Sequence, residues 1–149
     1  MGAGFLASEK GIWLTKKIPI RKVTKTQANV YLSKAEQFYR TMKEAQENED
    51  WDAVGLNAIH CVISANDALL GTLHGFRPAG GSHSETAELL GQYEHSEQSK
   101  RSIARLDRMV KKKNLVEYEG RSLTPSEARK LSKDADRFLR WVRSRLGRP

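Results

Sequence analysis

Helical periodicity extends over almost the whole chain after its N-terminal segment, and this feature most restricts the possible fold. Apolar side chains recur at spacings of three and four residues, which places them on one face of an α-helix. Four long segments show the pattern, at residues 26–47, 51–74, 96–114 and 124–147. The last of them begins with a capping sequence at 124–127, and a shorter segment begins with one at 82–85. We therefore predict an all-α fold, an antiparallel bundle of four main helices plus one short helix.

The N-terminal segment, residues 1–23, lacks this periodicity. Glycines and Pro19 separate its short apolar pieces, a pattern that predicts an irregular arm or at most a short pair of strands. The length of 149 residues suits a single domain. We therefore divide the chain into an arm at residues 1–23 and a helical bundle domain at residues 24–149.

The segment at residues 51–74 is apolar around most of its circumference and rich in small residues, which predicts the central helix of the bundle. Polar side chains nevertheless follow one face of it at steps of three, four and seven residues: Asn57, His60, Ser64, Asp67 and His74. Buried polar groups need partners or water. The stripe therefore predicts the wall of a site, an internal hydrogen-bond ladder or a partly exposed face.

The formal net charge of +8 is distributed unevenly along the chain. Residues 1–25 carry a net charge of +5, residues 26–97 carry −7, and residues 98–149 carry +10. This asymmetry indicates either a surface that binds a polyanion or an attraction between the two parts, within one fold or across a dimer.

Basic side chains form rows on the two C-terminal helical segments. One row contains Arg101, Arg105, Arg108 and Lys112, and the other contains Arg129, Lys133, Arg137 and Arg140. Arginine suits bidentate contact with phosphate. However, the outer face of any bundle helix is charged, and acidic residues interrupt both rows, so a solvated face is the alternative interpretation of each.

The remaining composition excludes several classes of protein. The lone cysteine, Cys61, excludes an internal disulfide framework and a cysteine-based zinc site. The four histidines lack metal-ligand spacing, and we expect neither a metal nor another cofactor. We find no signal sequence and no segment that approaches a membrane span, so we expect a cytoplasmic protein without membrane partners.

Two short motifs resemble the HEPN superfamily (higher eukaryotes and prokaryotes nucleotide-binding). They are Asn57-Ala58-Ile59-His60-x3-Ser64-Ala65-x-Asp67-Ala68-Leu69-Leu70 and, after a glycine-rich loop, His83-x3-Ala87-Glu88-Leu89-Leu90. The resemblance covers roughly residues 26–145. It implies a helical bundle that is usually a homodimer, and either a metal-independent ribonuclease of a toxin–antitoxin or defence system or an inactive binding module.

Active members of the family carry an arginine, often followed by asparagine, four to six residues before a histidine. The matching positions here are Lys113, Asn114 and Tyr118, so the spacing is kept while both reactive residue types are replaced. Lysine lacks the planar guanidinium group of arginine. Tyrosine, which ordinarily ionises at about pH 10, transfers protons poorly at neutral pH. Arg77 and His83 also have the spacing, but His83 better matches the non-catalytic histidine of the family.

The resemblance and the charges together favour an RNA- or nucleotide-binding protein, catalytically impaired and dimeric, with a possible link to a toxin–antitoxin or defence system. We expect Lys113, Asn114 and Tyr118 to line one cleft with Asp67 and His60, and the basic side chains Arg101, Arg105 and Arg108 to hold phosphates. Two alternatives stay open. One is an active ribonuclease that uses Lys113 and Tyr118 or Arg77 and His83, and the other is a module that binds an antitoxin, another protein or a second copy.

Overall fold

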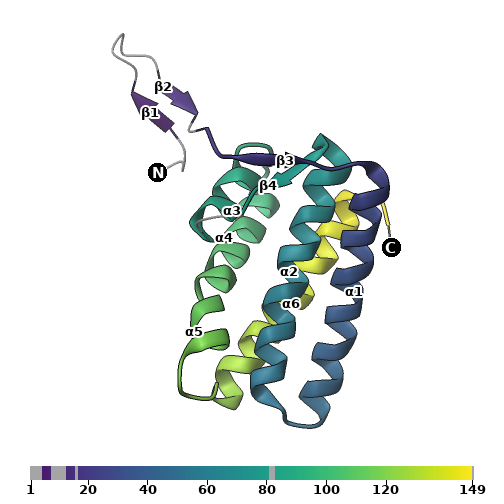
Figure 1. Cartoon of the computed structure of the whole chain (residues 1–149), viewed down its shortest axis with the longest axis vertical. Coiled ribbons are helices and arrows are strands. Elements are labelled where there is room, and N and C mark those ends of the chain that lie inside the picture. Colours follow the sequence, from purple (N-terminus) through teal and green to yellow (C-terminus); the bar gives the residue numbers. More distant parts are fainter. Residues whose placement is uncertain (1–4, 8–12, 16, 81–82, 149) are drawn as a thin grey trace.

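The computed structural model describes residues 5–7, 13–15, 17–80 and 83–148, and its helices form an antiparallel bundle (Figure 1). The helices in the described part are α1 (Lys25–Glu47), α2 (Trp51–His74), α3 (His83–Gly91), α4 (Glu97–Lys111), α5 (Lys113–Tyr118) and α6 (Pro125–Arg145). In Figure 1, α2 lies between α1 and the α3–α5 side of the bundle, and α6 packs behind it. The predicted all-α class is confirmed, with α3 as the predicted short helix.

Side-chain caps explain where two of the helices begin. The Thr24 hydroxyl accepts the Gln27 N–H at the start of α1, and Thr124 accepts the Glu127 N–H at the start of α6. In both cases the residue at the third helical position returns a hydrogen bond to the backbone of the cap, which completes a capping box. The box predicted for α6 is confirmed, whereas the one predicted at 82–85 lies partly outside the described residues.

The prediction of one continuous helix over residues 96–114 is wrong. The helix ends at Lys111, where the Lys112 N–H turns back toward the carbonyls of Met109 and Val110, and α5 then begins. The apolar pattern contains the reason for the break. A continuous helix that buries Leu106 and Met109 would direct residues 113 and 117 to the core, but these are charged, and the next apolar residues are Leu115 and Val116. The break lets these two pack against the core.

Short strands flank the bundle at its N-terminal side. β1 (Phe5–Ala7) pairs antiparallel with β2 (Trp13–Thr15), in line with the predicted strand pair. β3 (Ile20–Lys22) pairs antiparallel with β4 (Phe76–Pro78), a segment that the sequence predicted to be part of a glycine-rich loop. Gly75 ends α2 with φ of 77°, and its carbonyl accepts the Val23 N–H at 2.8 Å. This turn brings β4 alongside β3.

Small residues allow α2 to pack closely at the centre of the bundle, as predicted. Gly55, Ala58, Ala65, Ala68 and Gly71 are all buried. A Cβ atom at Gly71 would lie 2.7 Å from Val23 Cγ1 and 3.1 Å from the Ala28 Cβ, so the chain around the start of α1 sits directly against the α2 backbone. The core extends from α2 to the apolar stripe of α6, which includes Leu131, Phe138 and Val142.

Helix α2 is also long and apolar enough to cross a membrane, by length and composition only. The expectation that no segment approaches a membrane span was therefore wrong for α2 by those two criteria. In this fold 67% of its most apolar stretch is buried inside the bundle, and the core helix of a soluble protein meets the same criteria.

Candidate functional site

The structure brings two of the predicted site residues together at the contact between α2 and α5. Glu117 on α5 bridges them, with its Oε1 3.4 Å from the His60 Nε2 on α2 and its Oε2 3.4 Å from the Lys113 Nζ one turn earlier on α5. The His60 ring also lies beside the Phe38 ring of α1, with 5.6 Å between the centroids. We call His60, Lys113, Glu117 and the adjacent Tyr118 the α2–α5 cluster.

Local structure explains how the α2–α5 cluster forms. The break at Lys112 rotates α5 so that Leu115 and Val116 face the core, and Lys113 and Glu117, four residues apart, then share the side of α5 next to α2. His60 is one of the few polar side chains on α2, and 37% of its side-chain surface is exposed. The cluster is therefore open to solvent as well as supported by the core.

The electrostatics of the α2–α5 cluster favour an ionised Glu117. Desolvation by burial acts to raise the pKa of this carboxyl, but the Tyr118 hydroxyl, the Lys113 ammonium and His60 together lower it below its ordinary value. The carboxylate therefore offers a negative charge to both Lys113 and His60 at neutral pH. Sequence reasoning missed Glu117, although its i, i+4 spacing from Lys113 was a readable signal.

The other two residues of the predicted motif point toward solvent. Asn114 is exposed, and Tyr118 has 75% of its surface exposed, the largest fraction among the exposed large hydrophobic residues of the described chain. Tyr118, the position to which the resemblance assigns a histidine, thus presents an aromatic ring to solvent beside Lys113.

Asp67 lies two turns beyond His60 on α2 and in a different environment. It is buried, and this burial raises the pKa of its carboxyl to about 7 although the Arg77 guanidinium acts to lower it. Arg77 on β4 lies over the Tyr31 ring, 5.5 Å from its centroid, and donates to the Pro78 carbonyl at 3.3 Å. His83 opens α3, but its side chain lies outside the described residues.

The polar stripe of α2 therefore divides into separate environments. Asn57 donates to the Ala53 carbonyl at 2.8 Å, which is a local bond within the helix. His74, at the end of α2, packs against aromatic rings, 4.6 Å from Tyr93 and 5.9 Å from Phe76. Ser64 is half-buried between His60 and Asp67.

The predicted phosphate-binding row on α4 faces a buried carboxylate of α6. Asp134, whose side chain is only 7% exposed, lies 4.0 Å from the Arg105 Nε, 3.6 Å from an Arg108 guanidinium nitrogen and 3.9 Å from the Lys130 Nζ. Arg101 is exposed. Asp134 thus orients and partly neutralises two of the three arginines.

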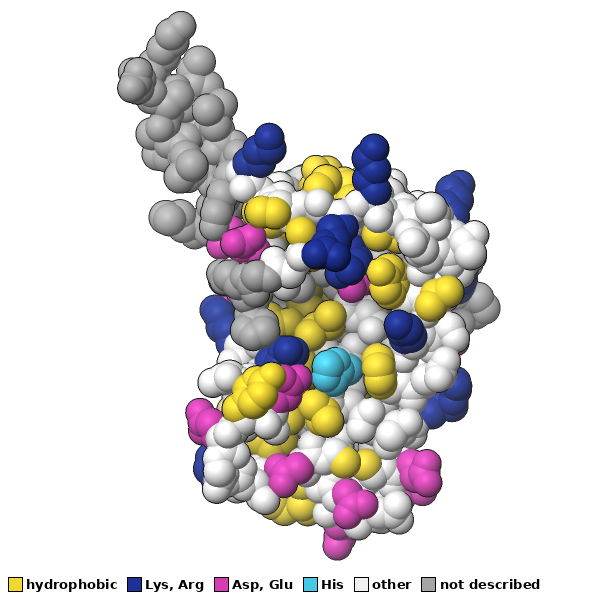
Figure 2. All heavy atoms as spheres, in the orientation of Figure 1, with side chains coloured by type: hydrophobic (Ala, Val, Ile, Leu, Met, Phe, Trp, Pro, Cys, Tyr) yellow, Lys and Arg dark blue, Asp and Glu magenta, His cyan; other side chains and the backbone are white. Residues whose placement is uncertain are grey.

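Charges of opposite sign also separate along the face drawn in Figure 2. Lys and Arg side chains gather toward the end of the bundle that carries β3 and β4, and Asp and Glu side chains gather toward the turn between α1 and α2. Within the described residues, no group of three or more His, Cys, Asp or Glu is placed to hold a metal ion.

Comparison with protein families identifies the family of this bundle. The HEPN domain family matches residues 28–145, which is well over half of the chain. The chain belongs to the HEPN domain family. Comparisons with curated proteins and with solved structures found no match.

Membership of the HEPN family indicates a function related to nucleotides or RNA. At the positions where the sequence predicted the family motif, the chain carries Lys113, which Glu117 holds, and the exposed Tyr118. The imidazole of the α2–α5 cluster comes from His60 on α2.

Proposed function

We propose that this HEPN protein binds single-stranded RNA or a nucleotide at the α2–α5 cluster and is impaired as a nuclease. The observation that carries the proposal is the bridge of Glu117 to both Lys113 and His60 beside an exposed Tyr118. Lys113 supplies a cation and Tyr118 supplies an aromatic ring at the surface of a HEPN domain, and both lie on the short helix α5.

The cluster contains the two elements that bind a nucleic-acid strand without reading its sequence. A lysine contributes charge to the contact with a phosphate, and an exposed aromatic ring stacks on an unpaired base. Tyr118 is already exposed, so stacking on it needs no opening of the core. The exposed Arg101 and the partly exposed Arg108 extend the positive charge along α4, toward α5.

The same geometry supports impaired catalysis. Lys113 cannot form the two parallel hydrogen bonds with which arginine grips a phosphate. Its ammonium group also lies 3.4 Å from the Glu117 carboxylate, which competes with any bound phosphate for the positive charge. Proton transfer by the tyrosine hydroxyl at neutral pH is poor compared with that of an imidazole.

RNA binding is tested directly by fluorescence anisotropy with a labelled single-stranded 12-nucleotide RNA. We expect Tyr118→Ala to weaken binding by about 1–3 kcal/mol, the usual contribution of one base stacked on an aromatic ring, and Lys113→Ala to weaken it as well. Arg40→Ala, which removes an exposed cation from α1, is the matched control for charge. Equal affinities for the wild type, Tyr118→Ala and Lys113→Ala would refute this site.

We also propose that the protein forms a homodimer or binds an oppositely charged partner such as an antitoxin. The net charges of −7 for residues 26–97 and +10 for residues 98–149 support a complementary contact. Light scattering at low and high salt tests the homodimer. A monomer under both conditions contradicts it.

A residual ribonuclease is the second candidate, and the His60–Glu117 pair favours it. A carboxylate beside an imidazole orients the ring and supports its role as a proton acceptor. Growth arrest upon expression, relieved by His60→Ala or Lys113→Ala, would support this candidate. If only Arg77→Ala or His83→Ala relieved the arrest, the activity would belong to the other motif-spaced pair.

A further inference from the structure

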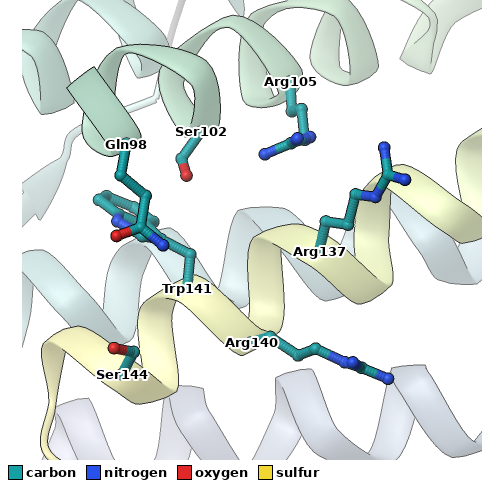
Figure 3. A pocket seen from close by; sticks show the side chains of 7 residues that line it. All are labelled: Gln98, Ser102, Arg105, Arg137, Arg140, Trp141 and Ser144. Atoms are coloured by element: carbon teal, nitrogen blue, oxygen red, sulfur yellow. The ribbon is translucent and has the colours of Figure 1, made fainter.

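A cavity of about 240 Å³ lies between α4 and α6, away from the α2–α5 cluster. Ser102 and Arg105 line it from α4, and Arg137, Arg140 and Trp141 line it from α6. In Figure 3 the Arg140 side chain extends along α6 and away from α4. Among the described residues, none of the side chains that line this cavity is acidic. Its wall combines three guanidinium groups, two serine hydroxyls, the Gln98 amide and an indole ring.

Two carboxylates hold the arginines of this cavity from outside. Asp134 lies 4.0 Å from the Arg105 Nε, and Asp136 lies 3.1 Å from the Arg140 Nε. Asp136 is itself fixed by the Tyr39 hydroxyl, which donates to its Oδ1 at 2.7 Å. These contacts use one side of each guanidinium group and leave further N–H donors, because each guanidinium carries five.

Arg137 differs from both neighbours, because it forms no ion pair with any described residue. It is exposed, and Figure 3 shows its side chain rising from α6 next to that of Arg105. The repulsion between these like charges is unfavourable unless an anion or solvent lies between them. The cavity thus has an unneutralised cation at its mouth.

Ser102 supplies an independent observation that indicates a ligand. This serine has no exposed surface, and its hydroxyl forms no hydrogen bond within the described part of the chain. Figure 3 shows its oxygen directed from α4 into the space above α6. Buried hydroxyl groups are normally hydrogen-bonded, and those that are not need an explanation. A ligand that accepts a hydrogen bond at the floor of the cavity is such an explanation.

We propose that the cavity between α4 and α6 binds the phosphate group of a nucleotide or of an RNA strand. Phosphate oxygens accept paired hydrogen bonds from guanidinium groups and one from a hydroxyl, which matches Arg105, Arg137 and Ser102. The Trp141 indole gives one wall an apolar surface for the attached sugar. This inference deepens the proposed function, on which it rests, by assigning a second phosphate position outside the α2–α5 cluster.

The test is a titration of the ¹⁵N-labelled full chain that follows the Trp141 indole N–H and the arginine Nε resonances. The probes are inorganic phosphate, adenosine 5′-monophosphate, adenosine and the single-stranded 12-nucleotide RNA, at constant ionic strength. We expect phosphate and the monophosphate to shift the Trp141 signal and adenosine to leave it unchanged. A saturating shift of the Trp141 signal with the monophosphate identifies a nucleotide as the ligand. A shift that only RNA produces at low concentration identifies an RNA strand as the ligand.

Variants of the cavity distinguish a specific site from general attraction to a positive surface. Arg137→Ala should weaken binding of the probe that saturates by about tenfold, as for one charge-assisted hydrogen bond. Ser102→Ala should weaken it about threefold to tenfold without lowering the melting temperature, because it removes a hydroxyl that has no partner in the fold. Arg40→Ala removes the same charge elsewhere and should have no effect.

Two results would overturn the inference. One is an equal shift with adenosine and with its monophosphate, and the other is equal probe affinity in Ser102→Ala, Arg137→Ala and Arg40→Ala. Arg137→Lys controls for a folding defect, because it keeps the positive charge. We expect this variant still to bind the probe more weakly than the wild type, because lysine cannot donate paired hydrogen bonds to a phosphate. If the cavity binds no phosphate, Tyr118→Ala should still weaken RNA binding. If instead the proposed function is wrong, Tyr118→Ala should not change RNA affinity, while phosphate should still shift the Trp141 signal.

Discussion

Asp67 shows at the scale of a single residue how burial on α2 alters chemistry. Its pKa in the folded protein is raised to about 7 from 3.8 by burial, against the opposing effect of Arg77. The folded state therefore binds this proton more tightly than the unfolded state does. The contribution of Asp67 to stability is greatest below about pH 4 and decreases as the pH rises through about 7.

Asp67→Asn should remove this pH dependence. Relative to the wild type, we expect the free energy of unfolding of the variant to rise between pH 4 and pH 8, by up to about 4 kcal/mol for a shift of this size. Urea denaturation across this range measures the difference between the two proteins, in which the opposite effects of other carboxyl groups such as Glu94 and Glu127 cancel. A constant difference would show that Asp67 stays ionised throughout.

Helix α5 carries Lys113 and Glu117, which form the ion pairs of the α2–α5 cluster, next to the exposed Tyr118. Glu117→Gln removes the carboxylate that engages both Lys113 and His60. We expect affinity for single-stranded RNA to rise by about threefold to tenfold, because Lys113 no longer has a competing partner and one negative charge is lost. Stability should fall by about 1 kcal/mol, because the side chains of these ion pairs are only partly buried.

Glu119→Gln is the matched control for this change. Glu119 is exposed and lies two residues after Glu117, and its replacement by glutamine changes the net charge by the same amount. An equal gain in RNA affinity for the two variants would mean that net charge alone is responsible and that the bridge of Glu117 plays no part.

Helix α2 depends on close backbone approach at Gly71. A methyl group there would meet Val23 and Ala28, so Gly71→Ala should lower the free energy of unfolding by about 1–3 kcal/mol through overpacking. At Gly91, the last residue of α3, the nearest atom to a new Cβ lies 4.0 Å away, and Gly91→Ala should instead be neutral or stabilising by up to about 1 kcal/mol. Chemical denaturation compares the two, and an unchanged stability in Gly71→Ala would contradict the packing.

Elements whose limits depend on local chemistry were predictable from the sequence. The capping box at Thr124 and the apolar stripe after it predicted α6, and the small residues predicted the central place of α2. The pairing of β3 with β4 was not predictable, because it joins segments more than 50 residues apart through backbone groups. The break before α5 was readable only as a shift in the phase of the apolar residues.

The candidate site was predictable only where spacing along one helix determines it. The motif spacing singled out Lys113 and Tyr118, which lie on α5, a helix that the sequence did not predict, and the stripe on α2 included His60. Sequence could not show that Glu117 joins them, or that Asp134 of α6 engages Arg105 and Arg108 of α4. Those contacts depend on how separate helices pack, which single-helix patterns do not contain.

For the whole molecule, the net charge of +8 predicts attraction to RNA, but the ion pairs reduce the number of cations that are free to contribute. Lys113, Arg105 and Arg108 are all engaged by carboxylates, whereas Arg101 and Arg137 form no ion pair within the described residues. Binding to a strand should therefore use only a few phosphate contacts rather than the full formal charge.

RNA binding through phosphate contacts is best examined by measuring how the affinity for the single-stranded 12-nucleotide RNA depends on salt concentration. With about three phosphate contacts, the logarithm of the association constant should fall with the logarithm of salt concentration at a slope of about −2, or about twentyfold between 50 and 200 mM. Lys113→Ala should make the slope shallower by at most about 0.7, because Glu117 already neutralises part of the charge of Lys113. No measurable binding at 50 mM salt, or an affinity that does not change over this range, would contradict the account.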